Sequence, residues 1–223
     1  MRALQRTLQV LFTVVAFSAV AAHATTLTID IASEPGATPG RVLFTGTGNT
    51  IDFPNATDGF DFSIVGSSDP ALIGLKGNLS GPFTIGSIST FGALQTAAVS
   101  NMGSFSIFDG SNTFSADLKL IDVATVGTGI ILNTSGTPNL SNFSYAGGNS
   151  TLLSLLGSLD PTVVLTGQFA LPKSLTALTN DGAANSSVYS GTVAATVPEP
   201  SSYLLLAAGL VAAAASMRSR RVD

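Results

Sequence analysis

The side chains best suited to acid–base or metal chemistry are aspartates that stand in glycine-containing turns. Asp58 and Asp61 flank Gly59-Phe60, and Asp109 precedes Gly110-Ser111-Asn112. Carboxylates grouped with amide and hydroxyl oxygens are the ligands that Ca²⁺ prefers, so both turns are candidate calcium loops. Neither turn has the EF-hand spacing, and Asp before Gly is an ordinary turn signal. The sequence therefore favours a turn role for these aspartates and predicts no metal site.

Paired carboxylates for glycoside hydrolysis are a second alternative. Glu34 lies in a Pro- and Gly-containing loop, and Asp117 and Asp122 lie on or beside a predicted strand. A glycosidase needs two carboxyl groups at a defined separation, and no spacing here singles out such a pair. Charged residues mostly lie on surfaces, so solubility is the favoured role. Asn78 and Asn142 begin Asn-x-Ser sequons, which matter only in a glycosylating host.

The residue types that are missing exclude several function classes. The chain has no Cys and no Trp, and its single histidine, His23, lies in a segment that we expect to be removed on export. A mature chain without Cys or His has no thiol chemistry, no Ser–His hydrolase site, no disulfide and no Cys- or His-ligated metal. We therefore predict a non-enzymatic protein with no catalytic residue, no bound metal and no cofactor.

The charge balance argues against nucleic acid as a partner. The net charge of the 223 residues is -4, with thirteen acidic and nine basic side chains. Only two of the acids lie outside residues 25–197, whereas five of the basic residues do, all of them arginines. The middle of the chain is therefore more acidic than the average. Such a surface offers no electrostatic footprint for nucleic acid and no polybasic attraction to anionic lipid.

The first 24 residues contain the three parts of a secretory signal. Arg2 and Arg6 form a positive start, residues 8–22 are uncharged and mostly apolar, and Ala22-His23-Ala24 is an A-x-A cleavage pattern. The apolar stretch is short for a membrane span, which disfavours the alternatives of an uncleaved anchor or a buried helix. We predict that residues 1–24 are a signal peptide, that small Ala22 and Ala24 define the cleavage site, and that the chain is exported.

The C-terminal tail, residues 196–223, is a second ordered set of signals. Val197-Pro198-Glu199-Pro200 is stiff because two prolines fix φ and stop a helix that runs in from upstream. An uncharged, helix-prone segment follows from Tyr203 to Ala215, and a basic cluster comes close to the end of the chain. The membrane-anchor residues are Tyr203, Leu204, Leu205, Leu206, Leu210 and Val211, and the basic stop consists of Arg218, Arg220 and Arg221.

The length and flanks of this segment predict a transmembrane helix. About 15 helical residues span roughly 22 Å, less than the ~30 Å hydrocarbon core, and bilayer thinning or snorkelling of Arg218 closes the gap. Positive flanks stay in the cytoplasm, so the domain lies outside and the tail end inside. A buried Ala/Leu helix of a soluble domain is the alternative, and it leaves the basic cluster and the Pro-Glu-Pro element without a reason.

The order of these elements resembles a PEP-CTERM sorting signal. The resemblance rests on Pro198-Glu199-Pro200, the apolar segment and Arg218-Ser219-Arg220-Arg221, and it does not extend to the middle of the chain. In that family the tail is read by exosortase, a membrane-embedded protease/transpeptidase of Gram-negative bacteria that make extracellular polysaccharide. The resemblance implies that Pro198, Glu199 and Pro200 are the recognised element and that Glu199 is a feature of a substrate, not a catalytic acid.

The middle of the chain predicts β structure, because apolar and polar residues alternate over many short runs with Gly, Asn, Ser and Asp between them. Eight or more strands of this kind favour an antiparallel β-sandwich or a jelly-roll-like domain over residues 25–195. Asp61 alternates with Phe60 and Phe62, so the pattern places it on the polar face. The apolar members of the runs are Leu27, Ile29 and Ile31; Phe60, Phe62 and Ile64; Phe105 and Ile107; Phe114, Ala116, Leu118 and Leu120; Val163, Leu165, Phe169 and Leu171; and Tyr189, Val193, Ala195 and Val197.

Two short helices and one irregularity interrupt this pattern. Asn149 or Ser150 is a candidate N-cap for a helix over residues 151–156, whose leucines would cover a sheet edge or a barrel mouth. Pro172 suits the first turn of a second helical segment that ends at Asn180. The apolar phase changes at Leu120 and Ile121, which predicts a β-bulge or a strand that is buried on both sides.

These observations predict an exported bacterial surface or extracellular-matrix protein, sorted by its tail and processed by exosortase. We expect it at the inner membrane with its domain outside, and then at the cell surface or in the matrix after processing. Its expected partners are the membrane, exosortase and extracellular polysaccharide. The alternatives are a secreted carbohydrate-binding or carbohydrate-active protein, and an unprocessed single-span membrane protein.

Overall fold

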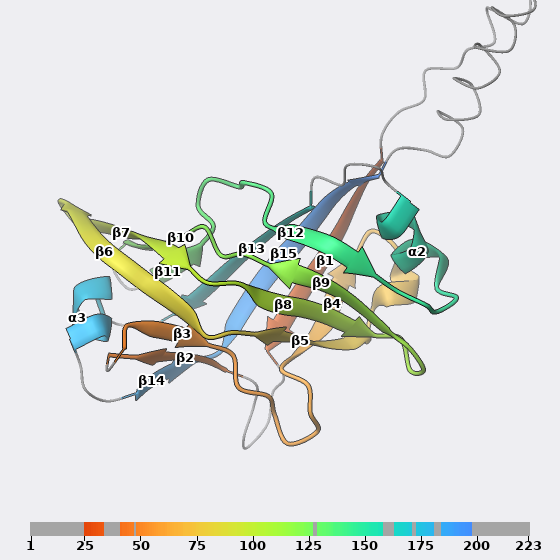
Figure 1. Ribbon diagram of the computed structural model, residues 1–223, viewed down its shortest axis with the longest axis horizontal. Helices are drawn as coiled ribbons and strands as arrows, with labels where there is room; N and C mark the ends of the chain where they lie inside the picture. Colours follow the sequence, from red (N-terminus) through yellow and green to blue (C-terminus); the bar gives the residue numbers. More distant parts are fainter. Residues whose placement is uncertain are drawn as a thin grey trace, which may run out of the picture. The chain divides into compact units, whose positions relative to one another are not determined.

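The computed structural model describes residues 25–33, 41–46, 48–126, 129–157, 163–170, 173–180 and 184–197. Within these ranges, Thr26–Thr196 form one compact unit. The unit is mainly β, as predicted, and its strands join in a single antiparallel sheet of order β12-β9-β8-β5-β4-β1-β15-β13-β11-β10-β7-β6-β3-β2-β14 (Figure 1). Most neighbours in this order are not consecutive in sequence, so long-range pairing holds the sheet together.

The described residues contain fifteen strands, two short α-helices and a 3₁₀ turn. Their bounds are β1 Thr25–Ser33, β2 Val42–Thr45, β3 Thr50–Asp52, β4 Phe62–Ser67, η1 Pro70–Leu72, β5 Lys76–Ser80, β6 Phe83–Phe91, β7 Leu94–Ser100, β8 Gly103–Phe108, β9 Thr113–Leu118, β10 Asp122–Val126, β11 Gly129–Leu132, β12 Leu140–Ser144, α2 Ser150–Gly157, β13 Val163–Ala170, α3 Leu175–Asn180, β14 Ala184–Ser187 and β15 Tyr189–Val197.

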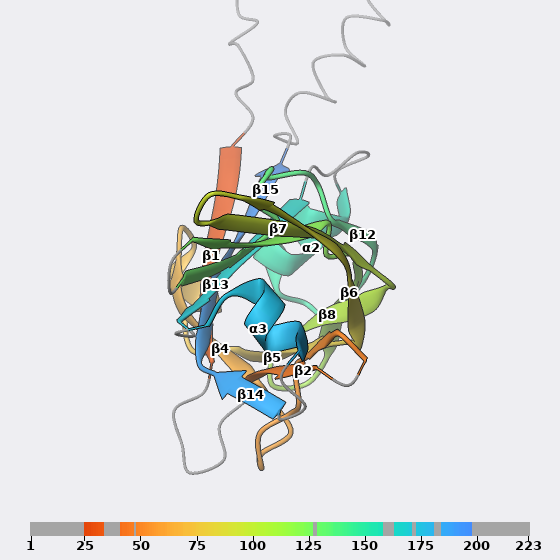
Figure 2. The ribbon, with the colours of Figure 1, turned by 90° about the vertical axis from the view of Figure 1, so that its left-hand side faces the viewer.

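The architecture differs from the predicted sandwich or jelly roll, because one curled sheet replaces two packed layers. The edge strand β12 contacts β13, and β7 and β2 lie on opposite sides of α3 (Figure 2). The inner face of the sheet therefore covers itself, as in a half-barrel. Alternation shows that one face of each strand is buried, but that face can be covered either by a second sheet or by the far side of the same curled sheet. The predicted sandwich or jelly roll is therefore wrong, and the sheet forms a half-barrel.

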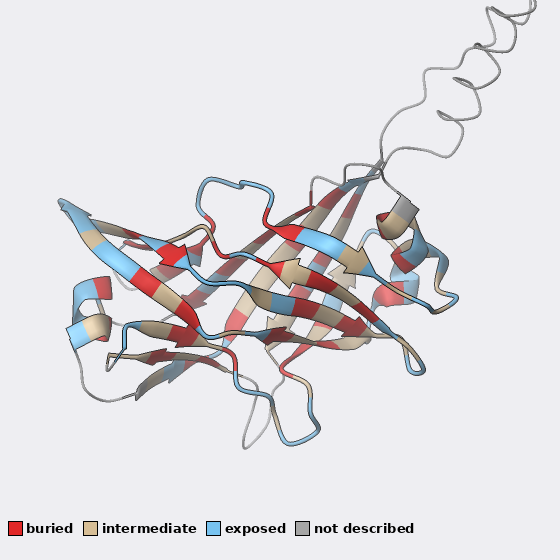
Figure 3. Cartoon of the chain, in the orientation of Figure 1, coloured by how far each residue is buried: buried red, intermediate tan, exposed pale blue. Residues whose placement is uncertain are grey.

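The core consists mainly of the inward-facing residues of this sheet, and the predicted apolar runs supply about half of the buried hydrophobic residues that the structure describes (Figure 3). Phe62 and Phe105 stack at 5.6 Å between ring centroids, and Phe44 meets Phe169 edge to face at 5.6 Å. Gly77 lies under this aromatic layer, where an added Cβ would come within 2.0 Å of the carbonyl oxygen of Ser106. Only glycine fits there, because the adjacent strand approaches too closely for any side chain.

The helix α2 begins where the sequence predicts. The Asn149 side-chain oxygen accepts from the backbone N–H groups of Thr151 and Leu152, both at 3.1 Å, so Asn149 is the N-cap. Leu152 and Leu155 are buried and α2 contacts the edge strand β12, which confirms that leucines of this helix cover a sheet edge. Leu153 instead points outward, with 42% of its surface exposed.

The helix α3 is held between β2 and β7 (Figure 2). Its N-terminus is capped twice: Ser174 Oγ accepts from the Ala177 N–H at 3.2 Å, and Gln95 Oε1, on β7, accepts from the Thr176 N–H at 2.9 Å. Its apolar side, Leu175 and Leu178, is buried in the half-barrel. The helix ends at Asn180 as predicted, whereas Pro172 lies outside the described residues.

The predicted irregularity at Leu120 and Ile121 separates two strands that serve different parts of the sheet. β9 ends at Leu118 and pairs with β8 and β12, and β10 begins at Asp122 and pairs with β7 and β11. The middle residues of β10 are buried on both faces of the strand. The phase change therefore marks a break between β9 and β10, and the prediction of a strand buried on both sides holds for β10.

Two buried asparagines complete the sheet next to this break. Asn139 Oδ1 accepts from the Leu165 N–H at 2.7 Å and its Nδ2 donates to the Leu165 carbonyl at 3.0 Å, so the amide acts as a short piece of strand. Asn133 Nδ2 donates to the same carbonyl at 3.1 Å. β11 pairs only with residues 167–170 of β13, and these amides satisfy the backbone where β11 has ended.

Candidate functional site

The two aspartate turns that the sequence singled out have structural roles. Asp58 Oδ1 accepts from the Phe60 N–H at 3.2 Å, and Asp58 Oδ2 forms an ion pair of 2.7 Å with Lys76. The hydrogen bond to Lys76 and the Phe60 N–H lower the pKa of Asp58. The side chain of Asp61 points into the half-barrel instead. Because the two carboxyl groups face different environments, this turn does not assemble a calcium loop.

Asp109 likewise organises its turn. Its Oδ1 accepts from the N–H groups of Ser111 and Asn112 at 2.8 and 2.6 Å, and its Oδ2 accepts from the Tyr145 hydroxyl. The Tyr145 hydroxyl donation is the main cause that lowers the pKa of Asp109. The same hydroxyl accepts from the Asn149 N–H at 3.0 Å, so this aspartate anchors the segment that leads into α2. The predicted role in turn formation is thus confirmed for Asp58 and Asp109.

Asp117 and Asp122, the two candidate glycosidase carboxylates that the structure describes, bind different partners. Asp117 accepts from Asn142 at 2.6 Å on the β9–β12 pair, and Asp122 accepts from the Thr134 N–H at 2.6 Å in another loop. Glu34 lies outside the described residues. The sequon residue Asn78 accepts from the Asp61 N–H at 3.1 Å. Among the residues that the structure describes, no three acidic or histidine side chains group as a metal site would require.

A buried carboxyl group is the main feature that the alternation misplaced. Asp61 was expected on the polar face, yet it is fully buried, because β4 begins only at Phe62 and the alternation does not extend back to Asp61. Asp61 Oδ2 accepts from the Leu79 N–H at 2.8 Å. Within the described part of the chain, Asp61 Oδ1 and the Tyr189 hydroxyl are both buried without a hydrogen-bond partner. Burial raises the pKa of Asp61 to about 7, and burial together with Asp61 raises that of Tyr189.

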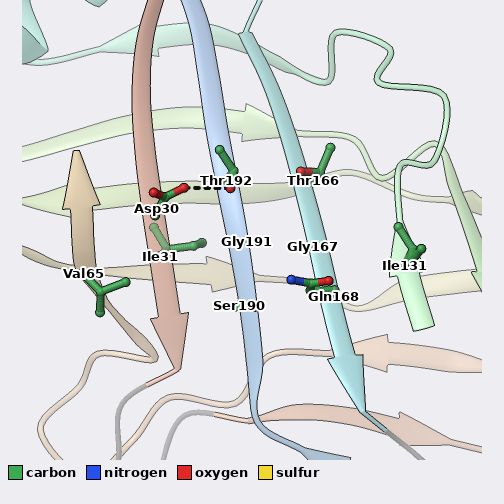
Figure 4. Close-up of a pocket in the computed structure, with 10 residues that line it drawn as sticks. All are labelled: Asp30, Ile31, Val65, Ile131, Thr166, Gly167, Gln168, Ser190, Gly191 and Thr192. Atoms are coloured by element: carbon green, nitrogen blue, oxygen red, sulfur yellow. Dashed lines mark hydrogen bonds between the residues drawn. The ribbon is translucent and has the colours of Figure 1, made fainter. Parts of the chain in front are cut away.

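The outer face of the sheet carries a shallow groove that crosses β4, β1, β15, β13 and β11 (Figure 4). The groove is a hollow of about 390 Å³ with a polar floor and aliphatic rims. A second hollow of about 480 Å³, lined mainly by apolar residues, adjoins it at Ile131, Gln168 and Ser190. The sequence shows these polar residues as the outward partners of the apolar runs, but not that their strands are neighbours. We call this surface the outer groove; its floor consists of Asp30, Thr166, Gln168, Ser190 and Thr192, and its rims are Val65 and Ile131.

The tip of the β6–β7 hairpin exposes an apolar cluster. Phe91 and Leu94 pair across the turn, and Val126 of β10 pairs with Leu94. Phe91 is 87% exposed and Val126 is 57% exposed. No charged residue occurs between Lys76 and Asp109 in the sequence, so the whole hairpin is neutral.

The predicted export and sorting residues lie outside the described residues, namely Ala22, Ala24 and the tail from Pro198 to Arg221. The proposed membrane helix belongs to this tail. In the part of the chain that is described, no helix has the length and apolar character needed to cross a membrane.

Comparison with known proteins identifies a sorting motif in the sequence that follows the β domain. Residues 196–221 match the family model of the PEP-CTERM protein-sorting motif. No curated protein and no solved structure matches the chain. The match confirms the resemblance, and it implies an exported protein that is sorted at the membrane or cell surface and processed by exosortase.

Proposed function

We propose that the chain is a non-enzymatic protein of the bacterial surface or extracellular matrix. It is exported by its N-terminal signal, held at the inner membrane by its tail, and displayed or released after exosortase cleavage, in association with extracellular polysaccharide. The observation that carries this proposal is the PEP-CTERM motif at residues 196–221, which begins within the last two residues of β15, the last strand of the β domain.

The hydrogen bonds and ion pair that the surface carboxyl groups already form support a role without catalysis. Asp58, Asp109, Asp117 and Asp122 each bind a neighbouring side chain or turn at 2.6–3.2 Å. A general acid–base pair needs two carboxyl groups that face one substrate, and these groups lie on separate turns and strands. The buried Asp61 lies inside the half-barrel and not at the outer groove.

The experiment is cell fractionation of the full-length chain in an exosortase-competent host and in the same host without exosortase. We expect the domain in the surface or matrix fraction of the first host and in the inner membrane of the second. A variant with Pro198, Glu199 and Pro200 changed to alanine should behave in the competent host as the wild type does without exosortase. An identical distribution in both hosts would overturn the proposal, and specific glycan cleavage by the purified chain would favour the carbohydrate-active alternative.

A further inference from the structure

The outer groove has the donor and acceptor groups of a site for hydroxyl-rich ligands. Its floor combines a carboxylate, three hydroxyl groups and one primary amide, which together both donate and accept hydrogen bonds. Thr192 Oγ1 donates to Asp30 Oδ1 at 2.8 Å and thereby orients the carboxylate on the floor (Figure 4). An added Cβ on Gly66 would lie 3.0 Å from Asp30 Oδ2, so the glycine of the adjacent strand leaves room for that oxygen.

The register places these groups in two rows across the sheet. Thr166 lies opposite Thr192 in one row, and Gln168 lies between Ser190 and Ile131 in the other. β4, with Val65, is four strands away from β11, with Ile131, which is about 19 Å at the usual strand spacing. Val65 and Ile131 are 58% and 41% exposed. A polar floor between aliphatic rims therefore extends over a length that accommodates a polymer.

The chemistry of the groove excludes most other occupants. Its floor is a sheet face whose backbone groups already bond to neighbouring strands, so a peptide cannot add to it as a further strand. An apolar ligand would cover the hydroxyl and amide groups without pairing them, which costs free energy for each group. Asp30 is the only ionisable side chain among the ten lining residues, so an anionic ligand would meet a single negative charge and no cation.

We propose that the outer groove binds a neutral glycan. Sugar hydroxyl groups donate to Asp30 and exchange hydrogen bonds with Gln168 and the Thr and Ser hydroxyls, and the C–H faces of the rings pack on Val65 and Ile131. This site would be the surface by which the protein contacts extracellular polysaccharide in its proposed matrix role. The inference rests on that proposed function, because the protein meets such glycans only outside the cell.

The test measures binding of the full-length chain, in detergent micelles, to an immobilised panel of neutral oligosaccharides of glucose, galactose, mannose and xylose. A uronic-acid oligosaccharide on the same support is the charge control. We expect binding to at least one neutral member and weaker binding to the acidic one. Gln168→Ala and Asp30→Asn should each weaken binding by about tenfold, because each removes a hydrogen bond of the size that corresponds to such a factor.

Ile131→Ser should also weaken binding, and Ile73→Ser is its matched control, because Ile73 is a similarly exposed isoleucine (50%) outside the groove. Circular dichroism of each variant shows whether the sheet is retained. The proposal is overturned if no neutral oligosaccharide binds, if the acidic one binds equally well, or if Ile73→Ser weakens binding as much as Ile131→Ser. Sorting by exosortase is measured separately in cells, so the glycan-binding result can be interpreted even if the proposed function is wrong.

Discussion

The buried Asp61 makes the stability of the β domain depend on pH in an unusual direction. Its pKa is about 7 in the folded protein and 3.8 in an exposed aspartate. Between these values the folded state binds a proton that the unfolded state has lost, so stability is complete below about pH 4 and falls as the pH rises to about 7. Each unit of pKa difference corresponds to about 1.4 kcal/mol. The difference between 3.8 and about 7 therefore lowers the free energy of unfolding by about 4 kcal/mol as the pH rises through this range.

The substitution Asp61→Asn removes this dependence and keeps the shape of the side chain. The amide oxygen can accept from the Leu79 N–H in place of Asp61 Oδ2. The amide nitrogen adds a donor close to the buried Tyr189 hydroxyl, which lacks a hydrogen-bond partner and whose pKa Asp61 raises. We expect the variant to exceed the wild type in stability at pH 8 and to approach it near pH 4. The assay is urea unfolding of the unit Thr26–Thr196, followed by circular dichroism between pH 4 and pH 8.

Asp58→Asn is the control of opposite sign. The Lys76 ion pair lowers the pKa of Asp58, so its contribution to stability is present above the ordinary aspartate pKa and is lost as the pH falls further. This substitution should leave the decrease between pH 4 and pH 7 in place. A wild-type stability that stays constant or increases over that range, or an Asp61→Asn variant with the same pH profile as the wild type, would refute the reasoning.

Three further substitutions test other parts of the structure. Gly77→Ala should destabilise the domain by about 3 kcal/mol or more in thermal unfolding, because its Cβ meets a backbone carbonyl, whereas Gly148→Ala, with open space around it, should change little. Asn139→Ala should cost about 1–3 kcal/mol, because it leaves the buried Leu165 N–H unpaired while Asn133 still donates to the Leu165 carbonyl. The exposed Ser135→Ala should cost less than about 0.5 kcal/mol, and equal effects would show that Asn139 does not satisfy the β13 backbone. Phe91→Ser should keep the melting temperature, because 87% of the Phe91 surface is exposed. A clear drop in melting temperature would show that the side chain is packed.

Much of the core was predictable because alternation reports directly on burial. The inward residues of β1, β8, β9, β13 and β15 are buried in the structure as the pattern predicts. β7 and β14 have few large apolar residues and give no comparable signal, so they are defined by their neighbours in the sheet. Strand order, and with it the half-barrel, depends on long-range pairing that no local pattern contains.

For the candidate sites too, the sequence predicted what depends on neighbouring residues and missed what depends on strand order. The turn roles of Asp58 and Asp109 followed from their local sequence, because a side chain that accepts from an N–H two residues ahead needs only local geometry. The burial of Asp61 depended on where β4 begins, and the outer groove depended on which strands are neighbours. The tail was recognisable because its signals are contiguous, and the matched family model covers the same residues.

Intact-mass analysis of the exported chain measures whether the tail acts as a signal for exosortase. The protein is purified from membrane and medium fractions of hosts with and without exosortase. We expect a start at Thr25 in both hosts, and loss of the C-terminal segment after the Pro198–Pro200 region only where exosortase is present. A chain that keeps Asp223 in the exosortase-competent host, or loses the segment equally in both hosts, would contradict it.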